Sequence, residues 1–217
     1  MDLIVGGGKY GYEAVKYLRR LGRSFIVIDR DRNCFVAKKL KLKFSEIEEI
    51  KEEGEYIVIG GLESAIKLVE EVKPELIFPT APVHIAAEFV RIKHGFDVWN
   101  DVIDKILAGL PLKVVISVGR GTIVVSYNRD YVCVENCSSP DVCPRTKIKK
   151  PCPMYDLVEF AYPEAFILIS KQLKPGLGAL KGEDILRLLK ESGKEDKIVV
   201  ATACRCHGVI TALRSKS

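Results

Sequence analysis

DLIVGGGKYGYEAVKYLRRL, residues 2–21, runs from a short apolar segment through a glycine cluster into an amphipathic stretch. The segment 2–5 has the length and composition of a buried strand. Apolar side chains at positions 14, 15, 18 and 21 share one face of a helix, which Gly22 should end. Because a second apolar run follows at 24–29, this part of the sequence predicts a βαβ unit with parallel strands.

The same alternation continues along the chain and predicts an α/β fold with a Rossmann-like parallel sheet at the N-terminus. Further elements of the first half are expected as strands at 56–60 and 75–79 and helices at 34–40, 63–72, 83–93 and 102–110. The second half is expected to hold a hairpin of strands at 113–118 and 122–127, strands at 165–170 and 197–202, and helices at 182–190 and 209–213. A cysteine-rich α/β second half therefore follows, and a boundary near 109–111 divides the chain into domains 1–110 and 111–217.

Composition excludes several classes of protein. A chain of 217 residues with 47% hydrophobic content can bury a core without cysteine crosslinks. The longest weakly charged stretch, 77–90, is shorter than the roughly 20 apolar residues that span a bilayer, and the N-terminus lacks the pattern of a secretory signal. We therefore expect a cytoplasmic protein without a membrane partner. The formal net charge of +5 is modest and its basic residues alternate with acidic ones, which does not favour nucleic-acid binding.

The glycine cluster matches the pattern G-x-G-x-x-G between an expected strand and an expected helix. Gly6 permits a tight turn, Gly8 leaves room for a pyrophosphate, and Gly11 lets the helix pack closely on the strand. Asp29 ends the second strand, where a carboxylate accepts hydrogen bonds from both ribose hydroxyls, so NAD is favoured over NADP. The alternative is a glycine turn that only packs, or one that has lost its nucleotide. The predicted dinucleotide site comprises Gly6, Gly7, Gly8, Lys9, Tyr10, Gly11 and Asp29.

About the first 80 residues resemble the NAD-binding N-terminal domain, of the RCK or TrkA-N type, of potassium-uptake regulators. The segments that carry the resemblance are Ile4-Val-Gly-Gly-Gly-Lys-Tyr-Gly-Tyr-Glu-Ala14, Val27-Ile-Asp-Arg-Asp31, Cys34 and Ala37. It implies a Rossmann fold in which Gly6, Gly8, Gly11 and Asp29 contact the cofactor. The sequence departs from that family at Gly60-Gly-Leu-Glu63, after the third strand, and throughout the cysteine-rich half.

Four of the seven cysteines fall in one stretch with few large apolar residues, at Cys133, Cys137, Cys143 and Cys152. Their spacing lacks the paired C-x2-C of typical zinc sites and matches no ferredoxin run, yet four thiolates on one loop can converge. We predict that these four hold an iron–sulfur cluster or a zinc ion. Disulfides are an alternative because the Lys- and Glu-rich, Gln-poor composition is typical of thermophiles, in which intracellular disulfides occur. Free thiols are the third reading.

A second cysteine group, Cys204-Arg-Cys206-His207, follows the expected strand at 197–202. Ligands of open α/β sheets collect beyond the carboxyl ends of strands, and the N-terminus of the helix expected at 209–213 would lower a thiol pKa. We therefore expect this group, the turn 79–84 and the glycine loop on one rim. Neither His84 nor His207 is assigned a catalytic role, and Cys34 is expected to be a small buried hydrophobe.

Three functions follow from these patterns. The first is a nicotinamide-dinucleotide-binding protein with a cysteine-ligated metal or iron–sulfur centre, acting as an oxidoreductase. The second, implied by the resemblance, is a non-enzymatic NAD-sensing module with disulfide-bonded or redox-sensing cysteines. The third is a redox or metal sensor whose nucleotide site is vestigial. No catalytic acid, base or nucleophile stands at a familiar spacing, so the sequence leaves enzymatic activity open. Rossmann domains commonly pair, and this analogy predicts a homodimer.

Overall fold

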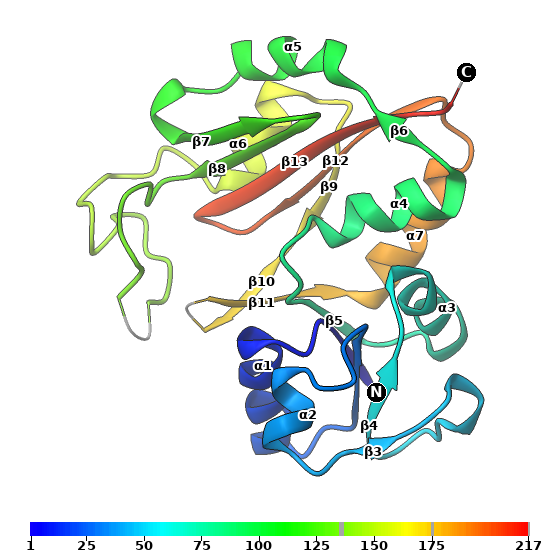
Figure 1. Cartoon of the computed structure of the whole chain (residues 1–217). Coiled ribbons are helices and arrows are strands. Elements are labelled where there is room, and N and C mark those ends of the chain that lie inside the picture. Colours follow the sequence, from blue (N-terminus) through cyan, green and yellow to red (C-terminus); the bar gives the residue numbers. More distant parts are fainter. Residues whose placement is uncertain (135–136, 175, 217) are drawn as a thin grey trace.

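The computed structural model describes residues 1–134, 137–174 and 176–216, which form two β-sheets and the helices that cover them (Figure 1). The strands are β1 (Asp2–Val5), β2 (Phe25–Asp29), β3 (Lys43–Phe44), β4 (Glu55–Ile59), β5 (Leu76–Pro79), β6 (Asp97–Val98), β7 (Val115–Gly119), β8 (Thr122–Ser126), β9 (Phe166–Ile169), β10 (Lys171–Lys174), β11 (Leu177–Lys181), β12 (Lys197–Ala203) and β13 (His207–Arg214). The first sheet has the order β10-β11-β5-β1-β2-β4-β3 and the second β7-β8-β13-β12-β9, with β6 beside β13.

The helices are α1 (Lys9–Arg20), α2 (Phe35–Lys39), α3 (Leu62–Val72), α4 (Ile85–His94), α5 (Ile103–Ala108), α6 (Met154–Ala161) and α7 (Gly182–Ser192). Short 3₁₀ helices span Ile47–Glu49, Asn100–Val102 and Leu112–Val114. Within the described ranges, no helix has both the length and the apolar character needed to cross a membrane.

The predicted parallel sheet is confirmed. β1 pairs in parallel with β2 and with β5, and β4 pairs in parallel with β2. Helices α1 and α2 cover one face of this sheet, and α3, α4 and α7 cover the other. Because both faces are covered, the strands are apolar along their length, as the run Phe25-Ile-Val-Ile28 illustrates.

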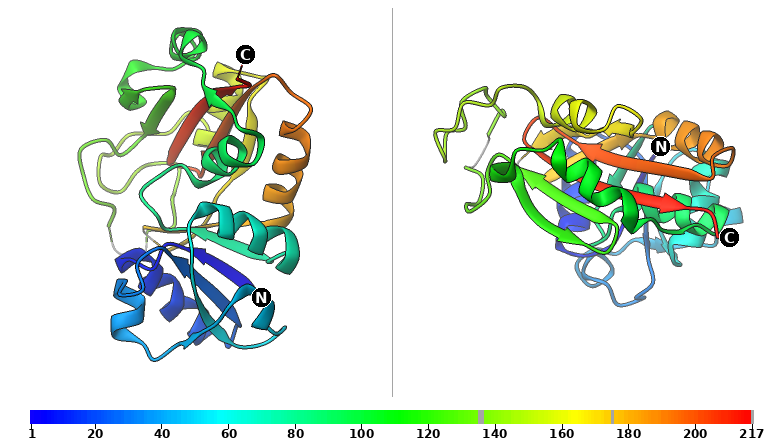
Figure 2. Two further views of the ribbon diagram at one scale, coloured as in Figure 1. Left: turned by 45° about the vertical axis from the view of Figure 1, so that its right-hand side comes forward. Right: turned by 90° about the horizontal axis from the view of Figure 1, so that it is seen from above.

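Helices α4 and α7 lie between the two sheets and pack against both of them (Figures 1 and 2). Their apolar faces belong to one core cluster that joins Leu3 and Ile77 of the first sheet to Leu168 and Val200 of the second. A separate cluster under α5 and α6 covers the other face of the second sheet. The shared cluster is the reason that the two sheets form one packed body.

The first sheet is extended by a hairpin that the sequence pattern does not predict. Its second strand, β11, pairs antiparallel with β5, placing Leu180 opposite Ile77, and β10 pairs antiparallel with β11. Strands β10 and β11 therefore come from the second half of the chain and complete the sheet of the first half. The division near residue 110 stays a prediction, and the two halves are interleaved at this hairpin.

The helix expected at 209–213 is wrong, because these residues belong to β13. This strand pairs antiparallel with β12 on one side and with β8 on the other. Its β-branched residues Val209, Ile210 and Thr211 suit a central strand of a sheet whose faces are both covered. Cys204 to His207 therefore form a hairpin turn, closed by the bond from the Cys204 amide to the His207 carbonyl at 2.9 Å.

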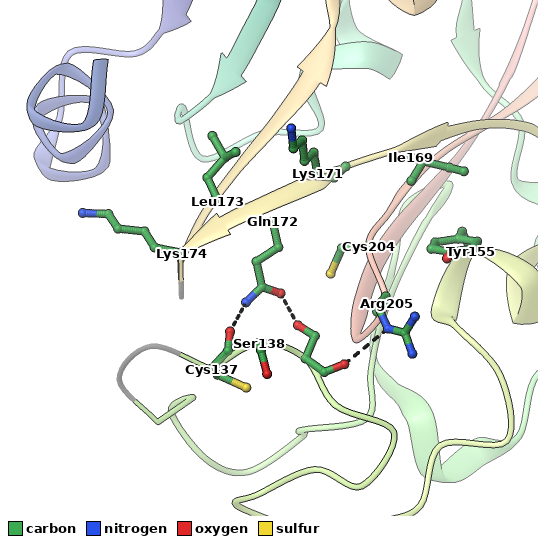
Figure 3. A pocket seen from close by; sticks show the side chains of 12 residues that line it. Cys137, Ser138, Tyr155, Ile169, Lys171, Gln172, Leu173, Lys174, Cys204 and Arg205 are labelled. Atoms are coloured by element: carbon green, nitrogen blue, oxygen red, sulfur yellow. Dashed lines mark hydrogen bonds between the residues drawn. The ribbon is translucent and has the colours of Figure 1, made fainter. Parts of the chain in front are cut away.

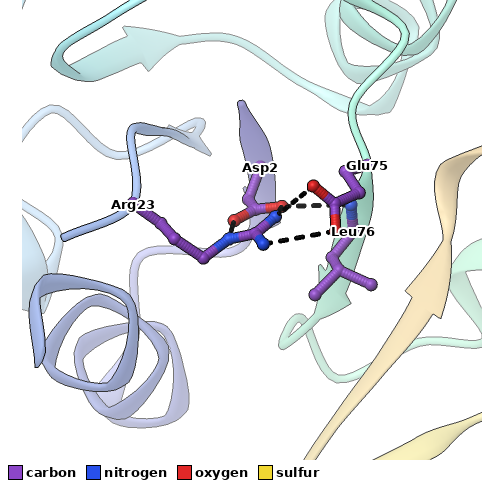
Figure 4. A network of polar contacts seen from close by, with 4 residues as sticks. All are labelled: Asp2, Arg23, Glu75 and Leu76. Atoms are coloured by element: carbon purple, nitrogen blue, oxygen red, sulfur yellow. Dashed lines mark hydrogen bonds and ion pairs between the residues drawn. The ribbon is translucent and has the colours of Figure 1, made fainter. Parts of the chain in front are cut away.

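Asp2, at the start of β1, is fully buried and carries the most enclosed ion pair of the described structure (Figure 4). The Arg23 guanidinium donates from Nε to Oδ2 of Asp2 at 2.6 Å and from Nη2 to Oδ1 at 2.7 Å. The Leu76 amide donates to Oδ1 at 3.1 Å, and Arg23 also contacts Glu75. This network ties β1 to the segment after α1 and to the start of β5.

His84, just before α4, joins the first half of the chain to the second sheet. Its ring nitrogens lie 2.8 Å from the Thr211 hydroxyl of β13 and 3.0 Å from the Thr202 hydroxyl of β12. Burial lowers the pKa of His84 to about 3, from an ordinary value of 6.5. The ring is therefore neutral in the folded protein at physiological pH.

We expect His84 to make the protein less stable in mild acid. Below pH 6.5 the unfolded chain protonates this ring while the folded chain does not, until the pH approaches about 3. The free energy of unfolding should therefore fall by about 1.4 kcal/mol per pH unit through this window from His84 alone. Urea denaturation of wild type and His84→Gln at pH 7 and pH 5 measures it. Equal losses in the two proteins would contradict the assignment.

Candidate functional site

The glycine loop between β1 and α1 has the geometry that its pattern predicts. Gly6 has a φ of 112°, and a Cβ there would lie 2.8 Å from the Ala81 amide nitrogen. A Cβ on Gly11 would lie 2.1 Å from the Gly6 carbonyl oxygen, so helix α1 packs directly on the loop backbone. A Cβ on Gly8 would meet nothing within 4 Å. Gly8 is therefore the point at which a ligand can approach the backbone.

A cavity of about 290 Å³ opens at the carboxyl ends of β1, β2, β4 and β5. Gly6, Gly8 and Asp29 line it, together with Arg30 and with residues of the turns 60–62 and 80–83. This is the edge at which parallel α/β sheets collect ligands, because helix N-termini point their free amides there. Lys9 and Tyr10 are exposed at the start of α1 and do not line the cavity.

Asp29 ends β2 beside this cavity, as expected. Its carboxylate accepts a hydrogen bond from the Gly7 amide at 2.6 Å and from the Asp31 amide at 2.9 Å. Gly7 itself is buried, and a Cβ there would lie 2.5 Å from the sulfur of Cys34. Cys34 is the predicted buried small residue, and burial raises the pKa of its thiol. The Cys34 side chain therefore packs against the backbone of the glycine loop at Gly7.

The thiols of the second half gather around another, much smaller cavity of about 20 Å³. Three of the four predicted ligands line it, Cys133, Cys137 and Cys143, and the fourth thiol there is Cys206 of the β12–β13 turn. Cys152 does not line this cavity. Its sulfur lies 4.0 Å from the Tyr127 hydroxyl, and the residue packs against the core of the second sheet.

Backbone amides donate hydrogen bonds to two sulfur atoms in and near this cavity. The amide of Thr146 lies 3.5 Å from the sulfur of Cys143, which lines the cavity. The amides of Cys206 and His207 lie 3.4 and 3.3 Å from the sulfur of Cys204, which belongs to the same turn but lies outside the cavity. Burial raises the pKa of Cys143, but the hydrogen bonds from Thr146 and Arg145 and the charge of Lys150 outweigh it and lower the pKa overall. Burial raises the pKa of Cys204.

His207 contacts two of the thiols. Its Nδ1 lies 3.7 Å from the sulfur of Cys204, and its Nε2 lies 4.0 Å from that of Cys133. Burial, followed by the charge of Lys150, lowers the pKa of His207, which keeps the imidazole neutral. The expectation that this turn shares a rim with the glycine loop is wrong. Residues 80–83 do reach the cavity beside the glycine loop, but Cys206 and His207 line the thiol cavity, and Cys204 and Arg205 line a neighbouring hollow.

A larger hollow of about 510 Å³ lies next to the thiols (Figure 3). Cys137 and Cys204 line it, and Lys171, Lys174 and Arg205 add positive charge around it. Gln172 of β10 holds the cysteine loop here, donating to the Cys137 carbonyl at 3.1 Å and accepting from the Ser139 hydroxyl at 2.5 Å. The Arg205 Nε also donates to the Ser139 carbonyl, at 3.3 Å.

All seven cysteines have free thiols in the structure. Across residues 1–134, 137–174 and 176–216, no three His, Cys, Asp or Glu side chains stand close enough to hold one ion. The four thiols that share the small cavity would have to move inward to bind a common metal. The loop residues 135 and 136, within the predicted cysteine segment, lie outside the described residues.

The sequence leaves Cys204 and Cys206 as reserve ligands, either of which a suitable fold could exchange for Cys152, and it gives no indication that Lys150 belongs to this site. The signal for Cys206 is its place just after an apolar run, but this does not say which loop the turn will meet. Lys150 follows three other basic residues and looks like part of a solvated loop, yet its side chain is buried. Both residues reach the cavity through contacts between segments more than 50 positions apart, such as the bond between Lys150 and Cys206.

Comparison with known proteins places the whole chain in one family. A family model described as AF_1314, "Uncharacterized protein, N-terminal domain", matches residues 1–85, and its C-terminal counterpart matches residues 84–216. A protein of Archaeoglobus fulgidus, described as "Uncharacterized protein", is 58% identical over 215 residues, which cover 99% of each chain. No solved structure matches the chain. The chain therefore belongs to the AF_1314 family.

Proposed function

We propose that the protein binds NAD at the β1–α1 loop and holds a metal ion or iron–sulfur cluster on the cysteines of its second half. The observation that carries this proposal is the open face of Gly8, which leads from a 290 Å³ cavity to the N-terminus of α1. A pyrophosphate fits such a position because free amides and the helix dipole both favour an anion. The resemblance to potassium-uptake regulators supports the same ligand.

Asp29 supports NAD over NADP. Its carboxylate stands at the end of β2 beside the cavity, where it can accept hydrogen bonds from the two ribose hydroxyls. A 2′-phosphate would bring a second negative charge to this carboxylate. Arg30 lines the same cavity and reduces the repulsion without removing it.

The thiol cavity supports the metal half of the proposal. Thiolates are the ligands that zinc and iron–sulfur clusters share, and four cysteines with a neutral histidine surround this space. A volume of about 20 Å³ has room for one ion, so zinc requires only that the four thiols move inward, whereas a cluster requires the loop to open. Bound zinc would stabilise the fold of the loop. A cluster would supply one-electron chemistry in the same chain as the proposed dinucleotide site.

The hairpin β10–β11 favours a second candidate, an NAD-sensing module rather than an enzyme. Lys174 pairs with Glu13 of α1 at 2.5 Å, while Gln172 on the same strand holds the cysteine loop. One short hairpin thus contacts both the helix whose N-terminus faces the dinucleotide cavity and the loop that carries the thiols. Loss of the Lys174–Glu13 pair should alter how one site responds to the other if the protein is a sensor.

Titration calorimetry with NAD tests the dinucleotide site. Gly8→Val should fold normally, because a Cβ at this position has open space, but its side chain should enter the cavity and weaken binding about tenfold or more. Gly119→Val is the matched control, since a Cβ there is equally free and lies on β7, away from the cavity. Equal NAD affinity in all three proteins, or none in wild type, would show that the site is wrong or empty.

A further inference from the structure

We infer that the fourth thiolate of the metal centre is Cys206, on the β12–β13 turn, and that the buried Lys150 ammonium neutralises the centre. This inference rests on the metal half of the proposed function. Cys133, Cys137, Cys143 and Cys206 line the same small cavity, whereas Cys152 faces Tyr127 and a different surface hollow. The assignment therefore replaces Cys152 in the ligand set that the spacing suggests.

Lys150 supplies the strongest evidence that an anion belongs in this cavity. The residue is 7% exposed, and its ammonium donates to the Ser139 carbonyl at 3.1 Å and to the Cys206 sulfur at 3.3 Å. Among the residues that the structure describes, no carboxylate forms an ion pair with it. Burying a lysine without an anionic partner is strongly unfavourable. Four thiolates around zinc or an iron–sulfur cluster keep a net negative charge, which would satisfy this ammonium.

Asn128 gives an independent sign of a missing partner. Its side chain lines the same cavity, is 7% exposed, and donates from Nδ2 to the Cys133 sulfur at 3.5 Å. Its Oδ1 is buried and has no hydrogen-bond partner among the described residues. Buried polar atoms are nearly always paired, and a lone acceptor oxygen calls for a hydrogen-bond donor or a cation such as a metal ion. The donors of Asn128 and Lys150 lie on the sulfurs of Cys133 and Cys206, where they favour negative charge on both thiols.

The position of Cys206 suits the role of an anchored ligand. The turn that carries it is held between two paired strands, and β12 and β13 pair along their full facing length from Lys197 and Arg214 to Ala203 and Gly208. The other three thiols lie on a loop with little regular structure. One ligand on the sheet and three on the loop would let a bound metal fasten the loop to the second sheet.

Metal analysis of the full chain, prepared without oxygen, tests the assignment. Iron, acid-labile sulfide and zinc are measured per chain in wild type, Cys206→Ser and Cys152→Ser, with Cys34→Ser as the control thiol outside the site. Cys206→Ser should contain at least about tenfold less metal per chain than wild type, while the other two variants keep the wild-type metal content. Circular dichroism of each variant shows whether the protein remains folded.

Lys150→Met tests the counter-cation, and Lys149→Met is its exposed neighbour and matched control. The first should release metal to a chelator at about tenfold lower chelator concentration, and the second should behave as wild type. These variants keep all seven thiols, so they report on charge even where Cys206→Ser fails to fold.

Each outcome separates this inference from the proposed function. Metal lost from Cys152→Ser and retained by Cys206→Ser, or lost equally from both, would overturn the ligand assignment while the proposed centre stands. A wild-type chain without metal in a reducing preparation would overturn both. Equal metal retention in Lys150→Met and Lys149→Met would overturn the role of the lysine.

Discussion

Arg23→Met should lower the free energy of unfolding by about 3 to 5 kcal/mol. The substitution would leave the Asp2 carboxylate buried without its cationic partner. In the wild type this fully buried side chain accepts two hydrogen bonds from the guanidinium. Only the Leu76 amide would remain as a donor to this carboxylate. Removing one partner of a buried pair strands the other charge away from water, and methionine replaces only the apolar stem.

Arg19→Met is the matched control for this result. Arg19 also forms a two-atom contact with a carboxylate, that of Glu55, but both side chains of this pair are more than a third exposed. Exposed pairs contribute about 0 to 1 kcal/mol, so this variant should be nearly as stable as wild type. Urea denaturation of the three proteins at one pH and salt concentration makes the comparison. A loss below about 1 kcal/mol for Arg23→Met would show that burial of Asp2 does not decide the energy of the network.

Gly11→Ala should destabilise the protein by about 3 kcal/mol or more, although alanine is the better helix former. A Cβ at this position would lie 2.1 Å from the Gly6 carbonyl oxygen, which is backbone and cannot swing aside. That carbonyl is also held by the Thr80 hydroxyl at 2.7 Å. Relief of the overlap therefore requires α1 to move away from the loop, which would open the core around Ala14 and Leu18.

Gly8→Ala distinguishes this steric effect from a general intolerance of the loop. The two glycines lie three residues apart, yet a Cβ on Gly8 has open space around it. Thermal unfolding should therefore show a large drop in Tm for Gly11→Ala and little change for Gly8→Ala. Similar values for the two variants would mean that the loop and the helix are not packed as closely as the structure shows.

Local pattern was sufficient for the first half of the fold. The strands at 2–5, 25–29, 56–60 and 75–79 were predicted within one residue and the helices between them within three, because each buried face repeats at the period of its own element. The glycine loop was equally readable, since close packing at Gly11 and an open face at Gly8 are requirements of one strand-turn-helix unit. The ligand of that loop stays a proposal.

What the sequence by itself determined is therefore the α/β class, the parallel sheet and the cavity beside Gly8 and Asp29. Only the tertiary structure decided that 209–213 is a strand, that β10 and β11 join the first sheet, and that Cys206 rather than Cys152 lines the cavity with the other thiols. An apolar run of five residues fits a helix or a strand until its neighbours are known, and β13 has neighbours on both sides. Cysteine spacing along a loop likewise permits several ligand sets, and the sequence does not show that the turn carrying Cys206 meets the buried Lys150 across the fold.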